Sequence, residues 1–570
     1  MKSLWRELVT AFHSFSVKQQ LWLAALLIIF ISSLTGLLVY ANNGTMIEVP
    51  QEGGELVEGI LGTPRFINPL LSVSDADRDL TALLYSGLLR PGQDGELIPD
   101  LAESYAISDD ARTYTFKLKK GLTFHDGVPL TADDIEFTIL KAQDPLIKSA
   151  RRAAWEGVSV EKVSDTEISF HLKQPYAAFL ENLTIGILPK HIWESITPEA
   201  FSLAEENVKP IGSGPFKLAE TKFDRSGLPL WYALEPFENF ALGKPKLTHV
   251  LLHFYPNEEE MVAALRGGEV HSGSAISPEQ ARALTDSNHH IVSTPFPRIF
   301  AVFFNQNENN VFTQQEVREA LDLAVDKQTI IDKVLAGYGT PLESPLPPGT
   351  LGAEETVKLA PYTERLEAAT NLLTKNGWTK NSSGVWSKKT KSATYTLSFS
   401  ISAPNTPELK AAAELITKNW QAFGAQVDLK AYELGDLNQN IIRPRKYEAL
   451  FFGEILGRDP DPFAFWHSSQ RLDPGLNIAL YTNITADKLL SDARGITNRS
   501  ARASRLAEFE AEVKKDAPAV FVYAPSFVYV VPRDIKGLVL PPPVTPADRF
   551  ASIYKWYVST EYVWPFFKNL

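Results

Sequence analysis

The nucleophilic, acidic and basic residues of this sequence do not occur at the spacings of known catalytic motifs. The 570 residues contain no glycine-lysine phosphate loop, glycine-rich dinucleotide loop, Gly-x-Ser-x-Gly elbow or His-Glu-x-x-His helix. The chain also has no cysteine, which excludes thiol nucleophiles, thiolate-bound metals, disulfides and lipid attachment through cysteine. We therefore predict a protein with no catalytic residue, no cofactor and no metal site.

Two pairs of histidines come nearest to a metal-binding pattern. His249 and His253 are four residues apart, but they lie in a segment with the alternation of a strand, which favours surface or cross-strand packing. The pair His289-His290 falls in an expected loop. Acidic pairs suited to a glycosidase occur in any chain with 68 Asp and Glu residues, and only the distance between carboxyl groups distinguishes them.

The overall composition indicates a large globular protein that does not bind nucleic acid. Hydrophobic residues make up 44% of the chain and aromatic residues 11%, which is typical of a packed interior. The 56 Lys and Arg residues against 68 Asp and Glu residues give a net charge of −12, the wrong sign for gripping phosphate backbones. A chain of 570 residues is too long for one core, so two large lobes or several domains are expected.

One N-terminal segment has the length and composition of a membrane span. No charged residue occurs from Gln19 to Ile47, and the twenty residues 21–40 are almost all apolar, enough to cross about 30 Å of hydrocarbon. The residues before them carry a net charge of +2, which predicts a cytoplasmic N-terminus and a body outside the cytoplasm. The alternative is a secretory signal cleaved after Val39-Tyr40-Ala41, although the apolar regions of such signals usually run for roughly 7–15 residues.

Strand and helix patterns alternate through the body, which predicts an α/β fold. Strict alternation over Thr113–Lys119 predicts a half-buried strand, and Thr131–Asp134 has the residue types of a helix N-terminus. Apolar residues at helical spacing predict helices over Asp79–Leu89 and Thr313–Leu335.

The segment Tyr114–Gly127, which reads YTFKLKKGLTFHDG, and the following Pro129–Ile135, which reads PLTADDI, form a long and specific motif. The motif resembles the signature of family 5 extracellular solute-binding proteins, the peptide- and nickel-binding receptors of ABC importers. The resemblance covers roughly residues 52–540. It includes further similar segments at Ile67-Asn68-Pro69, Gly212–Leu218, Val317–Lys327 and Asp516–Tyr523.

The resemblance implies a two-lobed periplasmic-binding-protein fold of type II, in the large peptide-binding class with an extra subdomain. To this fold the apolar N-terminal segment adds one transmembrane helix, an anchor in which the chain departs from many members of the family. The predicted divisions are a cytoplasmic N-terminus and anchor in 1–47, lobe I in 48–88, 208–297 and 526–570, the extra subdomain in 89–207, and lobe II in 298–525. Two crossovers would join the lobes, near Arg298-Ile299 and near Tyr523–Phe527. Flexible residues from Ala41 to Gly54 would tether the body to the anchor.

The function implied by the resemblance is capture of a short peptide between the lobes by hinge closure, followed by delivery to an ABC permease in the membrane. The protein would be a monomer on the periplasmic or cell-surface side, held in the lipid bilayer by residues 21–40. Two alternatives stay open. One is a sensory or envelope protein with the same fold, and the other is a receptor for a metal chelate or a sugar.

Eight residues are candidates for ligand binding under this resemblance: Arg65, Phe66, Asn305, Glu454, Asp459, Asp461, Trp466 and Tyr523. Arg65 and Phe66 would face the cleft after the first strand, or else form a plain surface turn. Trp466 would offer a stacking platform or belong to the core.

The amino-group anchor of the peptide-binding relatives is altered in this chain. In those relatives an aspartate shortly before an Asp-Pro-rich turn pairs with the ligand's free amino group. That turn is Arg458–Pro462 here, and the upstream position is Leu456. Either Glu454, Asp459 or Asp461 replaces the missing charge, or the ligand has no free amino terminus.

Overall fold

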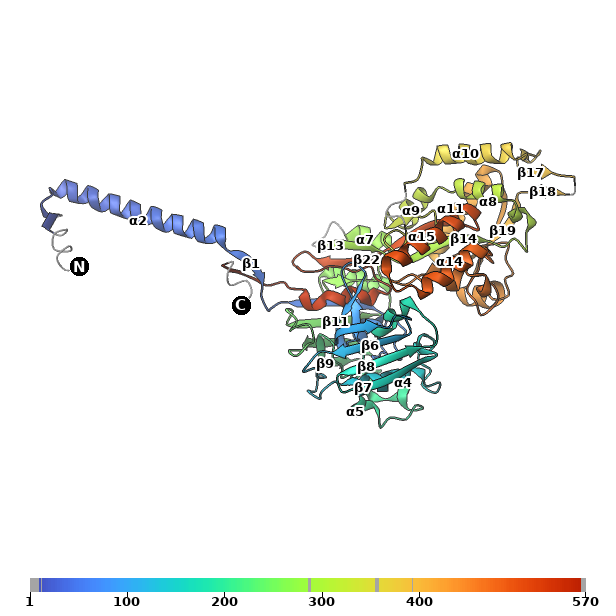
Figure 1. The fold of residues 1–570 in the computed structure, drawn as a ribbon. Helices are drawn as coiled ribbons and strands as arrows, with labels where there is room; N and C mark the ends of the chain where they lie inside the picture. Colours follow the sequence, from blue (N-terminus) through green and yellow to red (C-terminus); the bar gives the residue numbers. More distant parts are fainter. Residues whose placement is uncertain (1–9, 12, 285–288, 354–357, 392, 565–570) are drawn as a thin grey trace. The chain divides into compact units, whose positions relative to one another are not determined.

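The computed structural model describes residues 10–564 except residues 12, 285–288, 354–357 and 392 (Figure 1). The chain divides into two compact units. One comprises Met1–Gly53 with Tyr557–Leu570, and the other comprises Gly54–Trp556. Residues 48–53 and 557–570, which the sequence assigns to lobe I, therefore group with the N-terminal helix.

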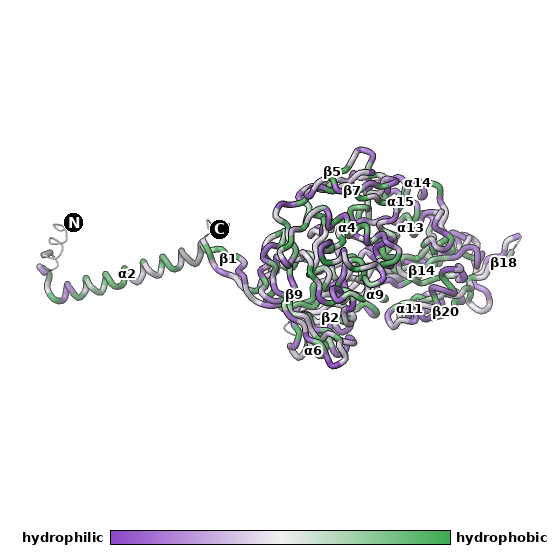
Figure 2. The backbone as a smooth tube through the Cα atoms, turned by 90° about the horizontal axis from the view of Figure 1, so that it is seen from below, coloured by the Kyte–Doolittle hydropathy of each residue, from purple (hydrophilic) through white to green (hydrophobic). Residues whose placement is uncertain are grey.

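The first unit is a long apolar helix followed by a two-stranded ribbon. Helix α2 (Val17–Thr45) contains a stretch of 24 residues, Val17–Tyr40, that is long and apolar enough to cross a membrane (Figure 2). None of these residues is buried. Strand β1 (Ile47–Pro50) pairs antiparallel with β23 (Thr560–Val563). The expected flexible tether over residues 41–54 is therefore wrong, because the helix continues to Thr45 and a strand from the end of the chain pairs with the residues that follow.

The second unit is built on one mixed sheet of twelve strands. Its strands are β2 (Glu55–Leu61), β9 (Phe216–Phe223), β10 (Pro229–Pro236), β11 (His249–Tyr255), β12 (Ser272–Gly273), β13 (His289–Pro295), β14 (Arg298–Phe304), β15 (Gly339–Pro341), β19 (Ser398–Pro404), β20 (Gln426–Tyr432), β21 (Ala449–Ile455) and β22 (Ala519–Pro532). The order is β20-β19-β21-β14-β22-β12-β2-β11-β10-β9, with β13 and β15 also paired to β22.

Strand β22 is long enough to belong to both halves of this sheet. Its residues Ala519–Tyr523 pair with β14, and Ser526–Pro532 pair with β13. The chain passes from β13 to β14 beside it, where the Phe296 N–H donates to the Pro525 carbonyl at 3.0 Å. The structure thus places the two predicted crossovers side by side.

Three smaller sheets complete the strands of the described residues. They are β5-β6-β8-β7, comprising Ala102–Ile107, Thr113–Leu118, Glu167–Leu172 and Val158–Ser164, then β3-β4, comprising Leu89–Pro91 and Leu97–Pro99, and β16-β17-β18, comprising Thr379–Lys380, Trp386–Lys389 and Thr394–Thr396. The strand predicted over Thr113–Lys119 is confirmed as β6.

The α-helices of the second unit are α3 (Asp75–Leu84), α4 (Ala132–Gln143), α5 (Lys190–Trp193), α6 (Glu258–Gly267), α7 (Pro278–Leu284), α8 (Gln315–Leu323), α9 (Lys327–Val334), α10 (Tyr362–Lys375), α11 (Pro407–Phe423), α12 (Leu434–Asp436), α13 (Phe463–Trp466), α14 (Ile484–Gly495) and α15 (Arg499–Asp516). The 3₁₀ helices are η1 (Arg152–Trp155), η2 (Ala177–Thr184), η3 (Phe201–Leu203), η4 (Glu205–Asn207), η5 (Asn310–Thr313), η7 (Ser468–Gln470) and η8 (Pro546–Lys555), and η6 (Leu437–Ile442) is a π-helix.

Two helix predictions need correction, and in both cases a capping side chain is the reason. The helix expected over Asp79–Leu89 runs instead over α3, because Ser74 accepts from the Asp77 N–H and sets an earlier start. The single helix expected over Thr313–Leu335 is two helices, α8 and α9. Asp326 accepts from the Thr329 N–H and caps α9, which breaks the apolar pattern.

Strand β14 shows how the sheet separates two hydrophobic cores. Val302 and Phe304 pack into one cluster, whereas Ile299, Ala301 and Phe303 pack into the other. Because successive side chains of a strand point to opposite faces, this alternation places one core on each face of the sheet.

The family-like motifs meet in space and fix one another. The His125 ring accepts from the Gly212 N–H at 3.2 Å, and its other nitrogen lies 3.2 Å from the Gly214 carbonyl oxygen. A Cβ added at Gly212 would lie 1.9 Å from the oxygen of Leu84, so only glycine permits this approach. The signature residues therefore hold the fold around α3.

Candidate functional site

Three adjoining cavities in the second unit form one groove, lined by residues of η1, η2, η8 and the loop 456–462. We name them, in the order in which they share lining residues, the outer cavity (about 870 Å³), the central cavity (about 290 Å³) and the inner cavity (about 140 Å³), and the names do not refer to depth. The outer and central cavities share Ala154, Tyr176 and Asn182. The central and inner cavities share Arg151, Thr184, Ile185, Thr545 and Asp548. A groove of this size and continuity suits an extended ligand.

Arg458 is the cation that joins the two sides of the central cavity. It donates to Oε2 of Glu181 at 3.0 Å and to Oδ2 of Asp548 at 2.9 Å, and only 4% of its side chain is exposed. Burial raises the pKa of Glu181, and the Arg458 guanidinium offsets part of that rise. These contacts connect the loop after β21 to η2 and η8.

The two predicted acids of the same loop are already paired with arginines. Asp461 accepts from Arg494 at Oδ1 (3.0 Å) and at Oδ2 (2.6 Å), and the Arg494 guanidinium lies 4.0 Å from the centre of the Phe463 ring. Asp459 forms an ion pair with Arg502. Both acids line the central cavity, where their charge is matched by the protein itself.

Glu454 is a buried acid without a partner. It is 2% exposed, and neither carboxyl oxygen has a hydrogen-bond partner among the described residues. Burial raises the pKa of Glu454 well above its usual value, and the Trp466 indole offsets this only in part. Glu454 lies opposite Ile299 in the β14–β21 pair, beside the crossover, and does not line the three cavities.

Three other predicted ligand residues lie in the interior. Trp466 is fully buried, with its ring 5.7 Å from that of Phe521, and the Tyr523 ring stacks on Phe300 at 5.1 Å. Asn305 is 1% exposed and donates to the Arg445 carbonyl at 2.9 Å. None of the three lines the groove, and their contact with a ligand stays a prediction.

Arg65 and Phe66 form the turn after β2. Both of their backbone N–H groups donate to Oδ1 of Asp77, at 2.7 and 2.8 Å. The Arg65 guanidinium lies 5.7 Å from the centre of the Phe66 ring. Asp77 of α3 thus holds this turn, which lies outside the lining of the three cavities.

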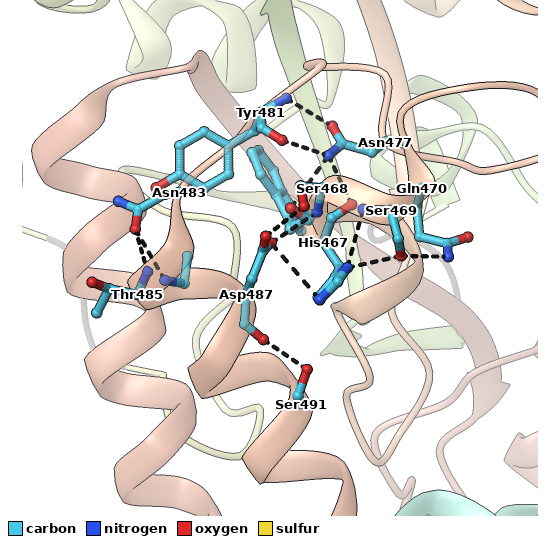
Figure 3. A network of polar contacts seen from close by, with 12 residues as sticks. His467, Ser468, Ser469, Gln470, Asn477, Tyr481, Asn483, Thr485, Asp487 and Ser491 are labelled. Carbon is cyan, nitrogen blue, oxygen red and sulfur yellow. Dashed lines mark hydrogen bonds and ion pairs between the residues drawn. The ribbon is translucent and has the colours of Figure 1, made fainter.

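A polar network holds the N-terminal part of α14, the helix to which Arg494 belongs (Figure 3). Asp487 of α14 accepts from the Ser468 N–H at 2.8 Å and from its hydroxyl. His467 accepts from the Ser469 N–H at Nδ1, 3.1 Å away, as a cap of η7. Although serine, histidine and aspartate meet here, the contacts are those of a capped turn that sets the position of α14.

Sequence reasoning missed the residues that build most of the groove. Glu181, Arg458 and Asp548 carry no local pattern, since their pairing joins segments far apart in the chain. Arg151 also lines the central cavity and carries no such pattern. The one available signal was Leu456, which lines the central cavity and which the resemblance predicts to stand where peptide-binding relatives carry an acid.

Comparison with known proteins shows that this chain is similar in sequence and fold to solute-binding proteins. A family model described as "Bacterial extracellular solute-binding proteins, family 5 Middle" matches residues 96–473. The oligopeptide-binding protein AppA of Bacillus subtilis is 30% identical over 517 residues, which cover 90% of this chain and 92% of AppA. The dipeptide-binding protein of Escherichia coli is 26% identical over 514 residues, which cover 84% and 91% of the two chains.

Solved structures agree with this placement. The structure of AppA from Bacillus subtilis in complex with a nonapeptide superposes with a TM-score of 0.65 at 29% identity, over 90% of this chain and all of that one. The structure of NikZ from Campylobacter jejuni in complex with Ni(L-His) gives a TM-score of 0.66 at 27% identity, over 88% and 99%. Both show the two-lobed fold expected from the sequence.

Proposed function

Because this chain belongs to the bacterial extracellular solute-binding proteins of family 5, we propose that it captures peptides outside the cytoplasm and delivers them to an ABC importer. The observation that carries the proposal is the continuous groove, whose outer, central and inner parts measure about 870, 290 and 140 Å³. AppA, which covers nearly the same length, holds a nonapeptide. The protein would release its ligand unchanged, since capture needs no catalytic residue.

Hinge closure explains how the groove would hold a ligand. The residues on one side come from η1, η2 and η8, and those on the other from the loop 456–462. Arg458 on one side forms ion pairs with Glu181 and Asp548 on the other. Closure would therefore pair three charges that face solvent when the groove is open. Hinge movement would occur at the adjacent crossovers near residues 296 and 525.

Within this function we propose distinct roles for the predicted site residues. Asp459 and Asp461 would shape the groove wall through their arginine partners, and Leu456 would offer an apolar contact. For Glu454 beside the crossover, a ligand role requires a more open state, because its carboxyl group is buried. We propose ligand roles in a more open state also for the five other predicted residues, which are Arg65, Phe66, Asn305, Trp466 and Tyr523.

We also propose that α2 anchors the protein as a single-pass membrane protein with its body outside the cytoplasm. The exposed apolar stretch Val17–Tyr40 supports this role, and cleavage as a signal would leave the body free. The functional partner would be an ABC permease in the same membrane, and the protein would act as a monomer. The domain divisions implied by the sequence are part of this proposal.

Native mass spectrometry of the full-length protein, extracted gently in detergent from its producing cells, tests the proposal. A ladder of bound masses that matches short peptides is expected. A single non-peptide mass would replace the peptide with a chelate or sugar. Transport is tested separately: deletion of the gene should abolish uptake of labelled peptides, whereas unchanged uptake would favour a sensory role.

A further inference from the structure

The two-stranded ribbon of the first unit lies directly at the end of the apolar helix (Figure 1). Helix α2 ends at Thr45, and β1 begins at Ile47 with one residue between them. Ile47 is paired with Val563, the last residue of β23. Strand β23 therefore runs toward the helix, and Trp564, which follows it, comes at the end of the ribbon nearest α2.

The length of α2 relates this end of the ribbon to the depth of a membrane. The stretch that could cross the hydrocarbon core ends at Tyr40. At a rise of about 1.5 Å per residue, Thr45 lies roughly 7–8 Å beyond it. The headgroup region extends roughly 5–8 Å from the core on each side of a bilayer. When α2 spans a membrane, the ribbon therefore begins at the outer edge of the headgroups, and any tilt of the helix brings it closer.

The residue types of the ribbon change from apolar and aromatic near α2 to polar and acidic farther away. Tyr562 and Trp564 belong to the end near the helix, and 65% of Tyr562 is exposed. Both side chains combine an apolar ring with a polar N–H or O–H group, a combination that is enriched where lipid meets water. Glu48, opposite Tyr562, is the acid of the ribbon nearest the helix. The near end comprises Met46, Ile47, Tyr562, Val563 and Trp564, and the far end comprises Pro50, Gln51, Glu52, Thr560 and Glu561.

The ribbon is also a sheet that needs a further surface to be stable. Strands β1 and β23 form a two-stranded sheet of their own, with four residue pairs. The Gln51 N–H extends the ladder by donating to the Ser559 carbonyl at 3.0 Å. An isolated two-stranded sheet is at best marginally stable in water, and packing against another surface stabilises it. A membrane interface at the near end would supply such a surface.

We propose that the near end of the β1–β23 ribbon lies in the headgroup region of the membrane, where Tyr562 and Trp564 contact the lipid. This inference rests on the proposed anchoring by α2. Because β1 and β23 contain acids and neither lysine nor arginine, the contact is made by the aromatic rings and does not require anionic lipid.

The contact would change how the second unit is tethered. The chain enters that unit after Gly53 and leaves it before Tyr557, so both of its connections pass through the ribbon. A membrane helix alone would hold only the first connection near the lipid. With Tyr562 and Trp564 at the interface, the strand that leaves the second unit would be held there as well.

Depth-dependent fluorescence quenching tests the proposal on the full-length protein in vesicles of phosphatidylcholine. Because the chain has no cysteine, a single cysteine can be introduced and labelled with bimane. The three positions are Leu27 inside the apolar stretch, Glu48 on the ribbon and Glu52 beyond its far end. Glu48 and Glu52 are both exposed, so these two substitutions each remove one exposed acid and form a matched pair. The vesicles carry nitroxide lipids labelled either at the headgroup or in the acyl chain.

We expect a different quenching pattern at each position. Acyl-chain nitroxides should quench the Leu27→Cys label. Headgroup nitroxides should quench the Glu48→Cys label several-fold more than the Glu52→Cys label, which lies roughly 13 Å farther along an extended chain.

Loss of the two aromatic rings separates their contact from the covalent link to α2. Combining Tyr562→Ser and Trp564→Ser with Glu48→Cys should reduce the headgroup quenching toward the level of Glu52→Cys. Trp564→Tyr alone keeps an interfacial ring and should retain most of the quenching. Neither change should alter the quenching of the Leu27→Cys label, since α2 stays in the membrane.

The outcomes that would contradict the proposal are distinct. A Leu27→Cys label that acyl-chain nitroxides do not quench would contradict the anchoring by α2, and the ribbon contact with it. A quenched Leu27→Cys label with equally weak headgroup quenching at Glu48→Cys and Glu52→Cys would overturn the ribbon contact and leave the anchor intact. Quenching at Glu48→Cys that persists without both rings would show that the link to α2 alone brings the ribbon to the lipid, which would overturn the roles of Tyr562 and Trp564.

Discussion

Glu58 and Glu454 are both buried glutamates on strands of the same sheet, but their surroundings differ completely. Glu58 of β2 is fully buried and accepts from Arg549 at 3.0 Å and from the Tyr529 hydroxyl at 2.7 Å. Arg549 also donates to both oxygens of Asp79, at 2.7 and 2.6 Å. Glu454 of β21 is 2% exposed and has no such partner among the described residues.

The difference shows two ways in which a fold accommodates a buried acid. Around Glu58, one guanidinium and the hydroxyls of Tyr529 and Ser272 satisfy the carboxylates, and the contacts connect β2, α3, β12, β22 and η8. Two acids share the single cation, and burial raises the pKa of Asp79 to about 6 although Arg549 opposes the rise. Glu454 has no cation at all, so its stable buried form is the neutral acid.

The largest expected effect comes from removing the shared cation. Arg549→Met leaves Glu58 and Asp79 buried without a counter-charge, and it should lower the free energy of unfolding by about 3–5 kcal/mol. Chemical denaturation at pH 7 measures the change. Arg533→Met, at an exposed arginine, should stay within about 0.5 kcal/mol. Equal midpoints for the two variants would show that the Glu58 cluster does not stabilise the fold.

His125 extends the comparison to a partly buried group whose two ring nitrogens both have hydrogen-bond partners but which is uncharged. Burial lowers its pKa to about 4, below the usual 6.5, so between these values the unfolded chain binds a proton that the folded chain does not. The free energy of unfolding should therefore fall by about 3 kcal/mol from pH 6.5 to pH 4, relative to His125→Gln. Urea titrations across this range test it, and parallel curves for the two proteins would contradict it.

Glu454 should show the opposite dependence on pH. Its raised pKa means that the folded chain keeps a proton that the unfolded chain releases above about 4.5. Stability relative to Glu454→Gln should therefore decrease as pH rises, by up to about 1.4 kcal/mol per pH unit until the folded-state pKa is reached. A difference that is independent of pH between 5 and 8 would mean that Glu454 has a partner in solution.

The secondary structure could be predicted from the sequence better than the partners of the buried charged residues, because helices and strands follow from local patterns. The strand at Thr113–Leu118 and the helix at Ala132–Gln143 follow from local periodicity and capping, which a sequence displays directly. The prediction of a single helix over Thr313–Leu335 was wrong because the side chain of Asp326 caps a new helix in the middle of a continuous apolar pattern.

The candidate site depends on pairing that local patterns do not contain. The Asp-Pro turn indicated that Asp459 and Asp461 lie near the groove, but their arginine partners come from α14 and α15. Nor does alternation along a strand specify which face a residue such as Tyr523 occupies. Partner and burial together decide whether an acid is available to a ligand, and both are tertiary properties.

The smallest expected effect tests whether solvent exposure, more than hydrogen-bond geometry, determines how much an ion pair contributes to the free energy of unfolding. Arg494 and Asp461 lie 2.6 Å apart, as close as Arg549 and Asp79, but their side chains are 36% and 18% exposed. Arg494→Gln should therefore cost only about 0.5–1 kcal/mol, because water solvates the charges of the separated partners. The loss should shrink in 1 M salt, whereas that of Arg549→Met should not. Arg505→Gln removes a more exposed pair and is expected to cost less still. If Arg494→Gln lowered the free energy of unfolding as much as Arg549→Met at every salt concentration, hydrogen-bond geometry and not exposure would set the contribution of an ion pair. The difference between Glu58 and Glu454 would then come from the hydrogen bonds that Glu454 lacks more than from burial.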